Sequence, residues 1–312
     1  MSYSISECPL CSCHDFAPVV TARDFHYGNP GEFTLVQCGE CSLCFLDPMF
    51  DDTELSTFYP KDYYAYTDQF GVKKFSFVKK LVRGILGLKE FQTKDPKFEQ
   101  PGRMLDIGCG SGWFLSRMRE QGWNVMGVEP NIAAAALGRS KQGLDIFAGS
   151  VIDAAFPSES FDYIRLNHSF EHMSEPNRIL PEVHRILAMN GKLMIGVPNR
   201  ASLNARLFGP YWVHLALPIH PFSYSTKTLE MMLKKHSFEI DNVIFNTNNA
   251  GIQGSIQFFL NRNDRSLKTE RFITDSRVAH VLTVWAAYLE NILHVADMIE
   301  VTATKKQLSL DG

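Results

Sequence analysis

The sequence lacks any uninterrupted apolar run long enough to cross a membrane, and its first residues have neither a basic start nor an apolar core. It also lacks internal repeats and low-complexity segments, and its net charge of −3 gives no basic footprint for nucleic acid. We therefore expect a cytoplasmic, globular protein that does not act on nucleic acid. Its 312 residues suffice for one large domain and one small one.

Cysteine is scarce beyond the first 44 residues, which contain six of the seven. Cys8 and Cys11 form one C-x-x-C knuckle, and Cys38 and Cys41 form a second after 26 intervening residues. Two such knuckles supply the four thiolates of a closed, structural zinc site. Disulfides are the alternative, which a reducing cytosol disfavours. The sequence thus predicts a zinc ribbon over residues 1–50.

Residues 103–115 (RMLDIGCGSGWFL) combine a strand pattern, three glycines at alternate positions and the start of a helical pattern. This arrangement lets backbone N–H groups approach a ligand closely. The spacing is G-x-G-x-G, because Trp113 stands where a dinucleotide fold has its third glycine. A second strand, 123–128, ends in Glu129, whose carboxylate can accept both hydroxyls of a ribose. Asp106 can orient the ammonium end of a cationic ligand.

These motifs resemble those of the class I S-adenosylmethionine-dependent methyltransferases. The LDIGCGSG turn is similar to the first motif of that family, and residues 128–130 are similar to its ribose-binding strand end. The resemblance continues through residues 161–164, 170–172 and 191–199, and it covers roughly residues 101–245. It implies an α/β fold with a doubly wound, Rossmann-like, seven-stranded sheet, here joined to the small zinc ribbon. It also implies an enzyme that uses S-adenosylmethionine.

The resemblance places the cofactor at the carboxyl ends of the first four parallel strands. At Ser150 the family often has an acidic residue, so Ser150 and Val151 are expected to contribute through their backbone. The implied cofactor contacts are Asp106, Gly108, Cys109, Gly110, Gly112, Trp113, Glu129, Pro130, Ser150, Val151, Asn167 and His168.

Three histidines are the candidate catalytic bases. Methyl transfer to a hydroxyl is an in-line displacement that needs alignment and removal of one proton, for which histidine is suited. His168 and His172 follow the fourth strand and would share one face of a helix that began at Ser169. His220 lies between two prolines. The H-x-x-E-H spacing of 168–172 can alternatively hold a divalent ion, and a related acidic cluster occurs here in ubiquinone-type O-methyltransferases; a simple helix cap is the third interpretation.

Residues 51–100 connect the ribbon to a methyltransferase domain over 101–312. The aromatic stretch 57–66 is expected to attach the ribbon to that domain, or alternatively to line a substrate pocket. The basic, amphipathic segment 73–89 is expected to cover the domain with its charges in water, with peripheral membrane contact as the alternative. Residues near 200–225, rich in aromatics and proline, predict a lid over the donor site.

The patterns beyond the lid predict five further elements. They are a helix over 226–236, a sixth strand over 238–245, an extra strand over 251–260, a core-covering helix over 278–297 and a last, antiparallel strand over 298–304.

A zinc ribbon followed by LCFLDP, a tyrosine-rich stretch and a methyltransferase domain resembles bacterial methyltransferases of sugar and polysaccharide biosynthesis. This resemblance implies methyl transfer to a small-molecule or glycan acceptor, at a sugar hydroxyl or carbon. One alternative is a zinc-ribbon methyltransferase of ribosomal RNA, which the acidic charge balance disfavours. The other is a non-catalytic protein that binds the cofactor.

Overall fold

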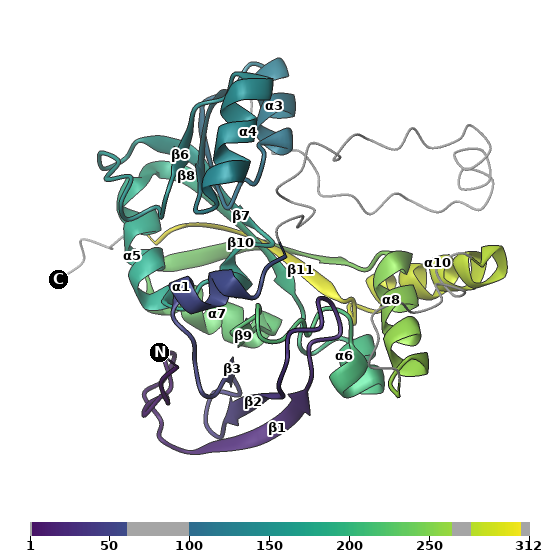
Figure 1. The fold of residues 1–312 in the computed structure, drawn as a ribbon. Coiled ribbons are helices and arrows are strands. Elements are labelled where there is room, and N and C mark those ends of the chain that lie inside the picture. Colours follow the sequence, from purple (N-terminus) through teal and green to yellow (C-terminus); the bar gives the residue numbers. More distant parts are fainter. Residues whose placement is uncertain (1, 61–99, 264–275, 307–312) are drawn as a thin grey trace.

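A computed structural model describes residues 2–60, 100–263 and 276–306, which form a seven-stranded sheet and a four-stranded sheet (Figure 1). The basic segment 73–89 and residues 61–66 of the aromatic stretch lie outside the described residues. In Figure 1 the smaller sheet lies below the larger one, and α8 (Asn249–Leu260) and α10 (Arg277–Ile292) project to the right. No helix in the described ranges is long and apolar enough to cross a membrane.

The large sheet has the doubly wound topology that the sequence predicts. β11 runs antiparallel to both of its neighbours, whereas β4 to β8 are parallel. Because β4 lies between β7 and β5, the chain winds outward from it in both directions, and ligands of such sheets bind at the carboxyl ends beside this switch point. The strands, in sheet order, are β10 (Phe238–Asn246), β11 (Met298–Lys305), β8 (Leu187–Pro198), β7 (Phe161–Asn167), β4 (Arg103–Ile107), β5 (Asn124–Glu129) and β6 (Ile146–Ala148).

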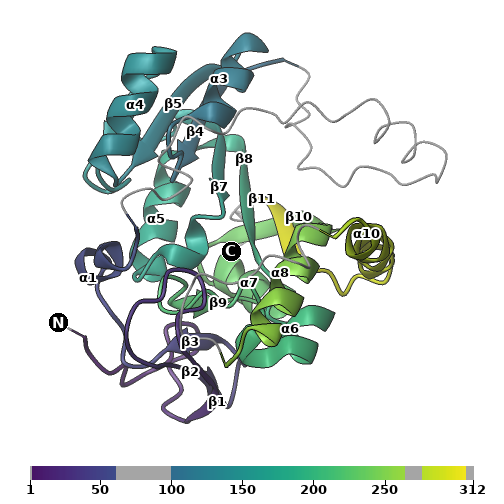
Figure 2. The same cartoon turned by 45° about the vertical axis from the view of Figure 1, so that its right-hand side comes forward.

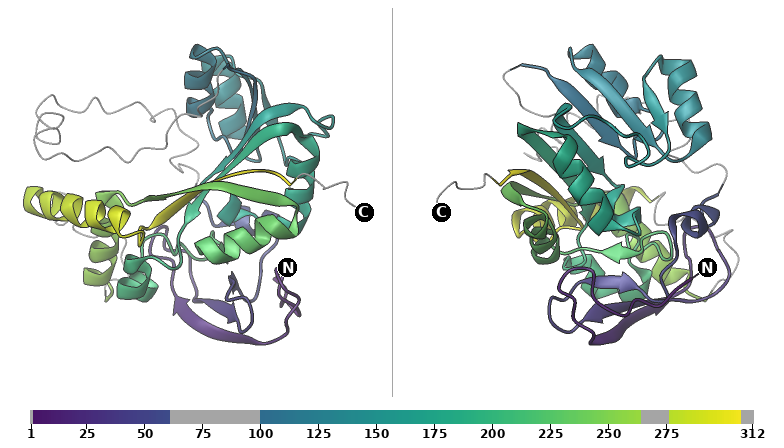
Figure 3. Two further views of the ribbon diagram at one scale, coloured as in Figure 1. Left: turned by 180° about the vertical axis from the view of Figure 1, so that it is seen from behind. Right: turned by 90° about the vertical axis from the view of Figure 1, so that its left-hand side faces the viewer.

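Two hydrophobic clusters cover the two faces of this sheet. Along β4, Met104 belongs to one cluster, while Leu105 and Ile107 belong to the other, as the alternation of side chains in a strand requires. The first cluster packs under α3 (Trp113–Glu120) and α4 (Ile132–Gln142); the second packs under α5 (Pro176–Ile186) and α7 (Thr226–Lys235) and continues into the small sheet. Figures 2 and 3 show α3 and α4 at one end of the molecule and the small sheet at the other.

The small sheet contains a strand from the lid. Its order is β1 (Phe16–Ala22), β2 (Phe33–Cys38), β3 (Cys44–Leu46) and β9 (Phe222–Ser223). Cys44 pairs with Ser223, and the Leu46 N–H donates to the Pro221 carbonyl at 2.8 Å. The predicted lid also contains α6 (Leu203–Phe208) and η3 (Gly209–Tyr211). The lid and the N-terminal sheet are therefore one packed unit.

The described part of the aromatic stretch, residues 57–60, contacts both the N-terminal unit and the large domain, and its role stays a prediction. α1 (Asp52–Thr57) leads into Phe58, whose ring packs edge-on against Phe33 at 5.7 Å and Phe50 at 5.2 Å between centroids. Tyr59 continues toward the large domain, where its hydroxyl lies 2.7 Å from Nδ1 of His172.

The predicted strand over 251–260 is wrong, because these residues form α8 (Asn249–Leu260). The Asn248 side chain caps this helix by accepting from the Gly251 N–H. A Cβ at Gly251 would lie 2.8 Å from Nε2 of His214, and one at Gly254 would lie 2.9 Å from Cγ2 of Val213. The glycines thus let the helix approach the lid closely, and this packing and the cap outweigh the β-like composition.

The predicted helix over 278–297 is confirmed as α10 (Arg277–Ile292), but its expected burial is wrong. Val278, Leu282 and Leu289 are all more than half exposed. α10 contacts α8, which itself packs on α6 and η3, so the helix lies outside the core of the large sheet. The remaining predicted elements are confirmed by α7, β10 and β11.

Candidate active site

The glycine turn at the end of β4 is tied to β5 and to the segment after β7. The N–H groups of Gly108 and Cys109 both donate to the Val128 carbonyl, at 2.8 and 3.2 Å. Gly108 and Gly112 have φ values of 78° and 79°. A Cβ at Gly108 would lie 2.5 Å from Cβ of Ser169, so the turn requires glycine for both conformation and space.

Glu129 lies where the sequence predicts it, at the end of β5 and facing the turn. Its side chain is 4% exposed, with Oε2 accepting from the Gly110 N–H and Oε1 accepting from the Asn131 N–H, both at 2.8 Å. Burial raises the pKa of Glu129, and the two backbone donors oppose that rise. A carboxylate has about four acceptor positions, so two remain for the hydroxyls of a ribose. The site thus fits a nucleoside beside the glycine turn.

Asp106 has a partner that the motif did not indicate. Both of its carboxylate oxygens lie 3.0 Å from Nη1 of Arg165 on β7, and the Asp106 side chain is 2% exposed. The guanidinium carbon of Arg165 also lies 3.9 Å from the centroid of the Phe114 ring. Burial raises the pKa of Asp106, and the Arg165 charge opposes the rise. An arginine within an apolar strand pattern was the available signal, and the ammonium-orienting role of Asp106 stays a prediction.

The other predicted cofactor residues lie along the same edge. Ser150 follows β6 and donates its hydroxyl to Asp153 at 2.6 Å, while Val151 is buried. Asn167 ends β7, Trp113 begins α3, and Pro130 follows Glu129. Burial raises the pKa of the Cys109 thiol well above its usual value, so this side chain is a neutral thiol at pH 7.

The three candidate histidines are not arranged as predicted. The segment after β7 is a single 3-10 turn, η2 (Phe170–His172), and His168 has a φ of 54°. This backbone separates the two histidines: the His168 side chain is 47% exposed, whereas His172 points toward His220 with their ring centroids 4.5 Å apart. The shared helical face is therefore wrong, because no α-helix begins at Ser169. The fold instead pairs His172 with a lid residue.

The tautomers of the paired histidines follow from their backbone contacts. Nδ1 of His172 lies 2.8 Å from the Ile219 carbonyl, and Nδ1 of His220 lies 2.9 Å from the His214 carbonyl. A carbonyl only accepts, so Nδ1 carries the proton in each ring and Nε2 carries the lone pair; in His172 this requires the Tyr59 hydroxyl, 2.7 Å from the same Nδ1, to act as an acceptor. Burial lowers the pKa of His172 and lowers that of His220 well below its usual value, so both rings are neutral at pH 7.

Glu171 lies beside these two rings. It is 1% exposed, and within the described part of the chain neither carboxylate oxygen has a hydrogen-bond partner. Nδ1 of His168 approaches one of them at 3.5 Å. One carboxylate oxygen of Glu171 and one ring nitrogen each from His172 and His220 lie within 4.8 Å of one another. Two neutral imidazoles and a buried carboxylate thus converge beside the glycine turn.

The four knuckle cysteines meet as the spacing predicts. Their Sγ atoms lie within 4.8 Å of one another, with Cys8–Cys41 and Cys11–Cys38 each at 3.5 Å. These separations exceed the ~2.05 Å of a disulfide and are close to the ~3.8 Å edge of a zinc–thiolate tetrahedron. Each knuckle has the same kind of backbone turn, in which the first cysteine's carbonyl accepts from the N–H of the residue four positions later: Ser12 donates to Cys8 and Ser42 donates to Cys38. The residues therefore fit a structural zinc ion.

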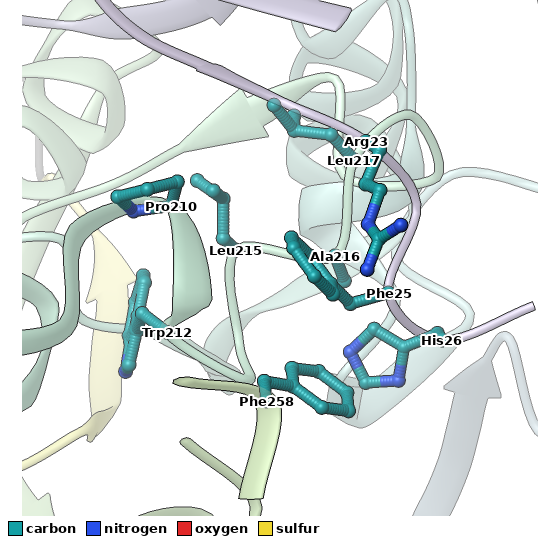
Figure 4. Close-up of a pocket in the computed structure, with 9 residues that line it drawn as sticks. All are labelled: Arg23, Phe25, His26, Pro210, Trp212, Leu215, Ala216, Leu217 and Phe258. Atoms are coloured by element: carbon teal, nitrogen blue, oxygen red, sulfur yellow. The ribbon is translucent and has the colours of Figure 1, made fainter. Parts of the chain in front are cut away.

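A small pocket lies between the N-terminal segment and the lid (Figure 4). The Phe25 ring stacks on Phe258 with centroids 5.6 Å apart, and the Arg23 guanidinium carbon lies 4.6 Å from the Phe25 centroid. The lining is mostly aromatic and aliphatic, which indicates packing between the two segments. It consists of Arg23, Phe25, His26, Pro210, Trp212, Leu215, Ala216, Leu217 and Phe258.

Comparisons with known proteins agree with this arrangement. A family model described as a methyltransferase domain matches residues 78–243, more than half of the chain. The chain is 30% identical over 156 residues to a ubiquinone biosynthesis O-methyltransferase of Bradyrhizobium sp. (strain ORS 278), covering 48% of this chain and 61% of that protein. It is 28% identical over 157 residues to the protein of the same name from Rhodopseudomonas palustris (strain HaA2), covering 46% and 62%. The chain thus spans less than two thirds of these relatives.

Some solved structures are similar to parts of this chain. One is an S-adenosylmethionine-dependent methyltransferase from Thermotoga maritima described as a possible histamine N-methyltransferase, with a TM-score of 0.46 and 20% identity over 74% of this chain and 90% of that one. Another is the geranyl diphosphate C-methyltransferase of Streptomyces coelicolor A3(2), with a TM-score of 0.44 and 16% identity over 66% and 72%.

Replacing Arg165 with methionine tests the buried pair. Arg165→Met leaves the Asp106 carboxylate buried without its charge partner, which should lower the free energy of unfolding by about 3 kcal/mol at pH 7.5. Burial raises the pKa of Asp106 in the folded state, so the penalty exists above that pKa and is relieved as pH falls through it. Urea unfolding at pH 7.5 and 5 should therefore show a smaller loss at pH 5. Arg103→Met, which removes an exposed pair with Asp162, is the control and should cost less than about 1 kcal/mol; equal losses for both variants would contradict the interpretation.

Proposed function

This chain belongs to the family described as a methyltransferase domain, and we propose that it transfers the methyl group of S-adenosylmethionine to a hydroxyl oxygen of a small molecule or glycan. The observation that carries the proposal is the contact between the donor turn and the histidine–glutamate segment. The Ser169 hydroxyl donates to the Ile107 carbonyl at 2.7 Å, and Ser169 fills the space beside Gly108. The segment that carries groups suited to deprotonating a hydroxyl thus lies next to the predicted donor site.

S-Adenosylmethionine, when bound, supplies a methyl group already activated on a positively charged sulfur. The residues of this chain then have two tasks, which are to hold the donor and to remove a proton from the acceptor. We assign the first to Glu129, Asp106 and the glycine turn, with Trp113, Pro130, Ser150, Val151 and Asn167 around them. For the second, His168 is the best-placed base, because it is the exposed histidine and its Nδ1 lies 3.5 Å from the Glu171 carboxylate. That carboxylate would stabilise the imidazolium formed when the proton is taken.

The other two candidate bases have different roles in this proposal. The Nδ1–H groups of His172 and His220 are tied to backbone carbonyls, and burial disfavours their charged forms. These rings therefore shape the acceptor side of the site. An oxygen acceptor is supported by the relatives named as O-methyltransferases. A sugar or glycan hydroxyl is the class suggested by the ribbon-plus-domain resemblance, and a phenolic hydroxyl is the class suggested by those relatives.

We also propose that Cys8, Cys11, Cys38 and Cys41 bind a structural zinc ion. Four thiolates fill the coordination sphere, which leaves no position for catalysis. The Cys8–Cys41 and Cys11–Cys38 sulfur separations are longer than a disulfide bond, which supports thiolate ligation and a reducing compartment such as the cytoplasm. The ion would stabilise a unit whose own hydrophobic core is small.

Replacing Glu129 with glutamine tests the donor site. In Glu129→Gln the charged acceptor for the ribose hydroxyls is lost, so the affinity for S-adenosylmethionine should fall about tenfold to a hundredfold. Isothermal titration calorimetry measures this directly. Glu120→Gln, at the exposed end of α3, is the matched control and should bind normally. Unchanged affinity in Glu129→Gln would exclude this carboxylate from the donor site.

A labelling experiment tests the acceptor. The purified chain and methyl-labelled S-adenosylmethionine should be incubated with separated pools of nucleotide sugars, glycans, phenolic quinone precursors and RNA. Label is expected as an O-methyl ether in a sugar, glycan or phenol pool, and His168→Ala should lower the turnover number at saturating donor by about 10²-fold or more. Label in RNA would favour the alternative enzyme class, and no transfer by protein that binds the donor would favour the non-catalytic alternative.

A further inference from the structure

The most unusual charged group in the described structure is Glu171. Its side chain is almost completely buried, and neither carboxylate oxygen accepts a hydrogen bond from any described residue. Burying an ionised carboxylate is costly unless a charge or donors compensate it. His168 is the one histidine that approaches it as an ion-pair partner, at 3.5 Å, and that ring is half in solvent. A second polar atom nearby, the buried hydroxyl of Tyr224, also lacks a hydrogen-bond partner in the described structure.

The two rings beside Glu171 present lone pairs. Because the Nδ1–H groups of His172 and His220 donate to backbone carbonyls, the remaining nitrogen, Nε2, is the unprotonated one in each ring. A backbone hydrogen bond that fixes the tautomer and orientation of an imidazole is the usual outer support of a metal-ligating histidine. The Tyr59 hydroxyl lies 2.7 Å from the same Nδ1 of His172, and with that nitrogen protonated the hydroxyl oxygen is an acceptor there.

We propose that Glu171, His172 and His220 bind a first-row divalent metal cation. One carboxylate oxygen and one nitrogen from each ring already lie within 4.8 Å of one another. Ligands of a common ion at ~2.1 Å lie about 3.4 Å apart, so shifts of less than about 1 Å complete the set. Two imidazoles and one carboxylate suit zinc, iron(II), cobalt or manganese better than calcium or magnesium, which prefer oxygen ligands.

The site would serve the acceptor. Three protein ligands leave open coordination positions, and a hydroxyl oxygen that binds there loses its proton more readily. The oxygen then attacks the methyl carbon, the sulfur–carbon bond breaks with its electron pair returning to sulfur, and the hydroxyl proton leaves through His168 to solvent. This role rests on the proposed O-methyl transfer, whereas the metal site itself rests only on the three side chains.

The binding test uses the full chain and two metal measurements. Wild-type protein purified in the presence of zinc should contain two equivalents per chain, one in the ribbon and one at Glu171. Cys38→Ser should lose the first and Glu171→Gln the second. Manganese has little affinity for thiolates, so it should bind at one site in protein whose ribbon alone is loaded with zinc. Electron paramagnetic resonance measures this binding. The affinity should be at least tenfold weaker in Glu171→Gln and in His220→Ala. Glu175→Gln, in an exposed pair with Arg178, is the control and should bind as the wild type does.

The outcomes separate this site from the proposed function. A wild-type chain with a single zinc equivalent and no saturable manganese binding would overturn the metal site, as would equal binding by Glu171→Gln. If S-adenosylmethionine binds and methyl groups reach a hydroxyl under those conditions, the function stands without the metal. If the second metal binds but no hydroxyl is methylated, the site stands and the proposed reaction fails. Donor affinity, measured on the same samples, shows whether Glu171→Gln is folded.

Discussion

The pairing of β9 with β3 is the contact on which the acceptor side of this protein depends. Only two residue pairs connect these strands, but Leu46 also donates to Pro221, and the Phe45 ring lies 6.4 Å from that of Phe222. All of these groups are buried, so the short strand is held by packing as well as by hydrogen bonds. His220 directly precedes this pairing. The N-terminal sheet thus fixes the position at which the lid presents His220 to His172.

This dependence gives the zinc knuckles a role beyond their own stability. Cys41 and Cys38 flank the turn that leads from β2 into β3, and β3 lies between β2 and the lid strand. An ion bound by the four thiolates would therefore hold the edge against which β9 pairs. The donor side is built from β4, β5 and the glycine turn. Its hydrophobic support under α3 and α4 does not include the small sheet, whereas Leu105 and Ile107 on the other face belong to the cluster that continues into that sheet. The two halves of the site meet at Ser169.

Much of the donor side could be predicted from the sequence, because its signals are local. The glycine turn, Glu129 and the order of the parallel strands follow from spacing and strand patterns within about thirty residues, and the paired C-x-x-C knuckles are nearly as specific. The acceptor side could not be predicted, because it depends on contacts across the chain. Tyr59, Glu171 and His220 all lie around His172, and the position of His220 depends on β9, whose two residues give no strand signal of their own. The contact between Arg165 and Asp106 was missed for a similar reason, because the two residues lie on neighbouring strands that are distant in the sequence.

The errors have a common physical cause. Residues 251–260 contain β-branched and aromatic side chains, but a side-chain cap and two glycines packed on the lid make them helical. The 168–172 segment has helical spacing, but a left-handed residue and a single 3-10 turn send its histidines in different directions. In both segments tertiary contacts outweigh local propensity, which spans less than about 1 kcal/mol per residue.

Hydrogen–deuterium exchange of Cys38→Ser beside wild type and Cys13→Ser would test most directly whether the ribbon holds the lid. We predict that loss of one knuckle thiolate lowers protection in β2 and β3 and, to a similar extent, in residues 219–224, while β4 to β6 keep theirs. Cys13 lies outside the thiolate cluster, so Cys13→Ser should exchange like the wild type. Lower protection confined to the N-terminal sheet, with residues 219–224 unchanged, would contradict the view that the ribbon and the lid form one unit.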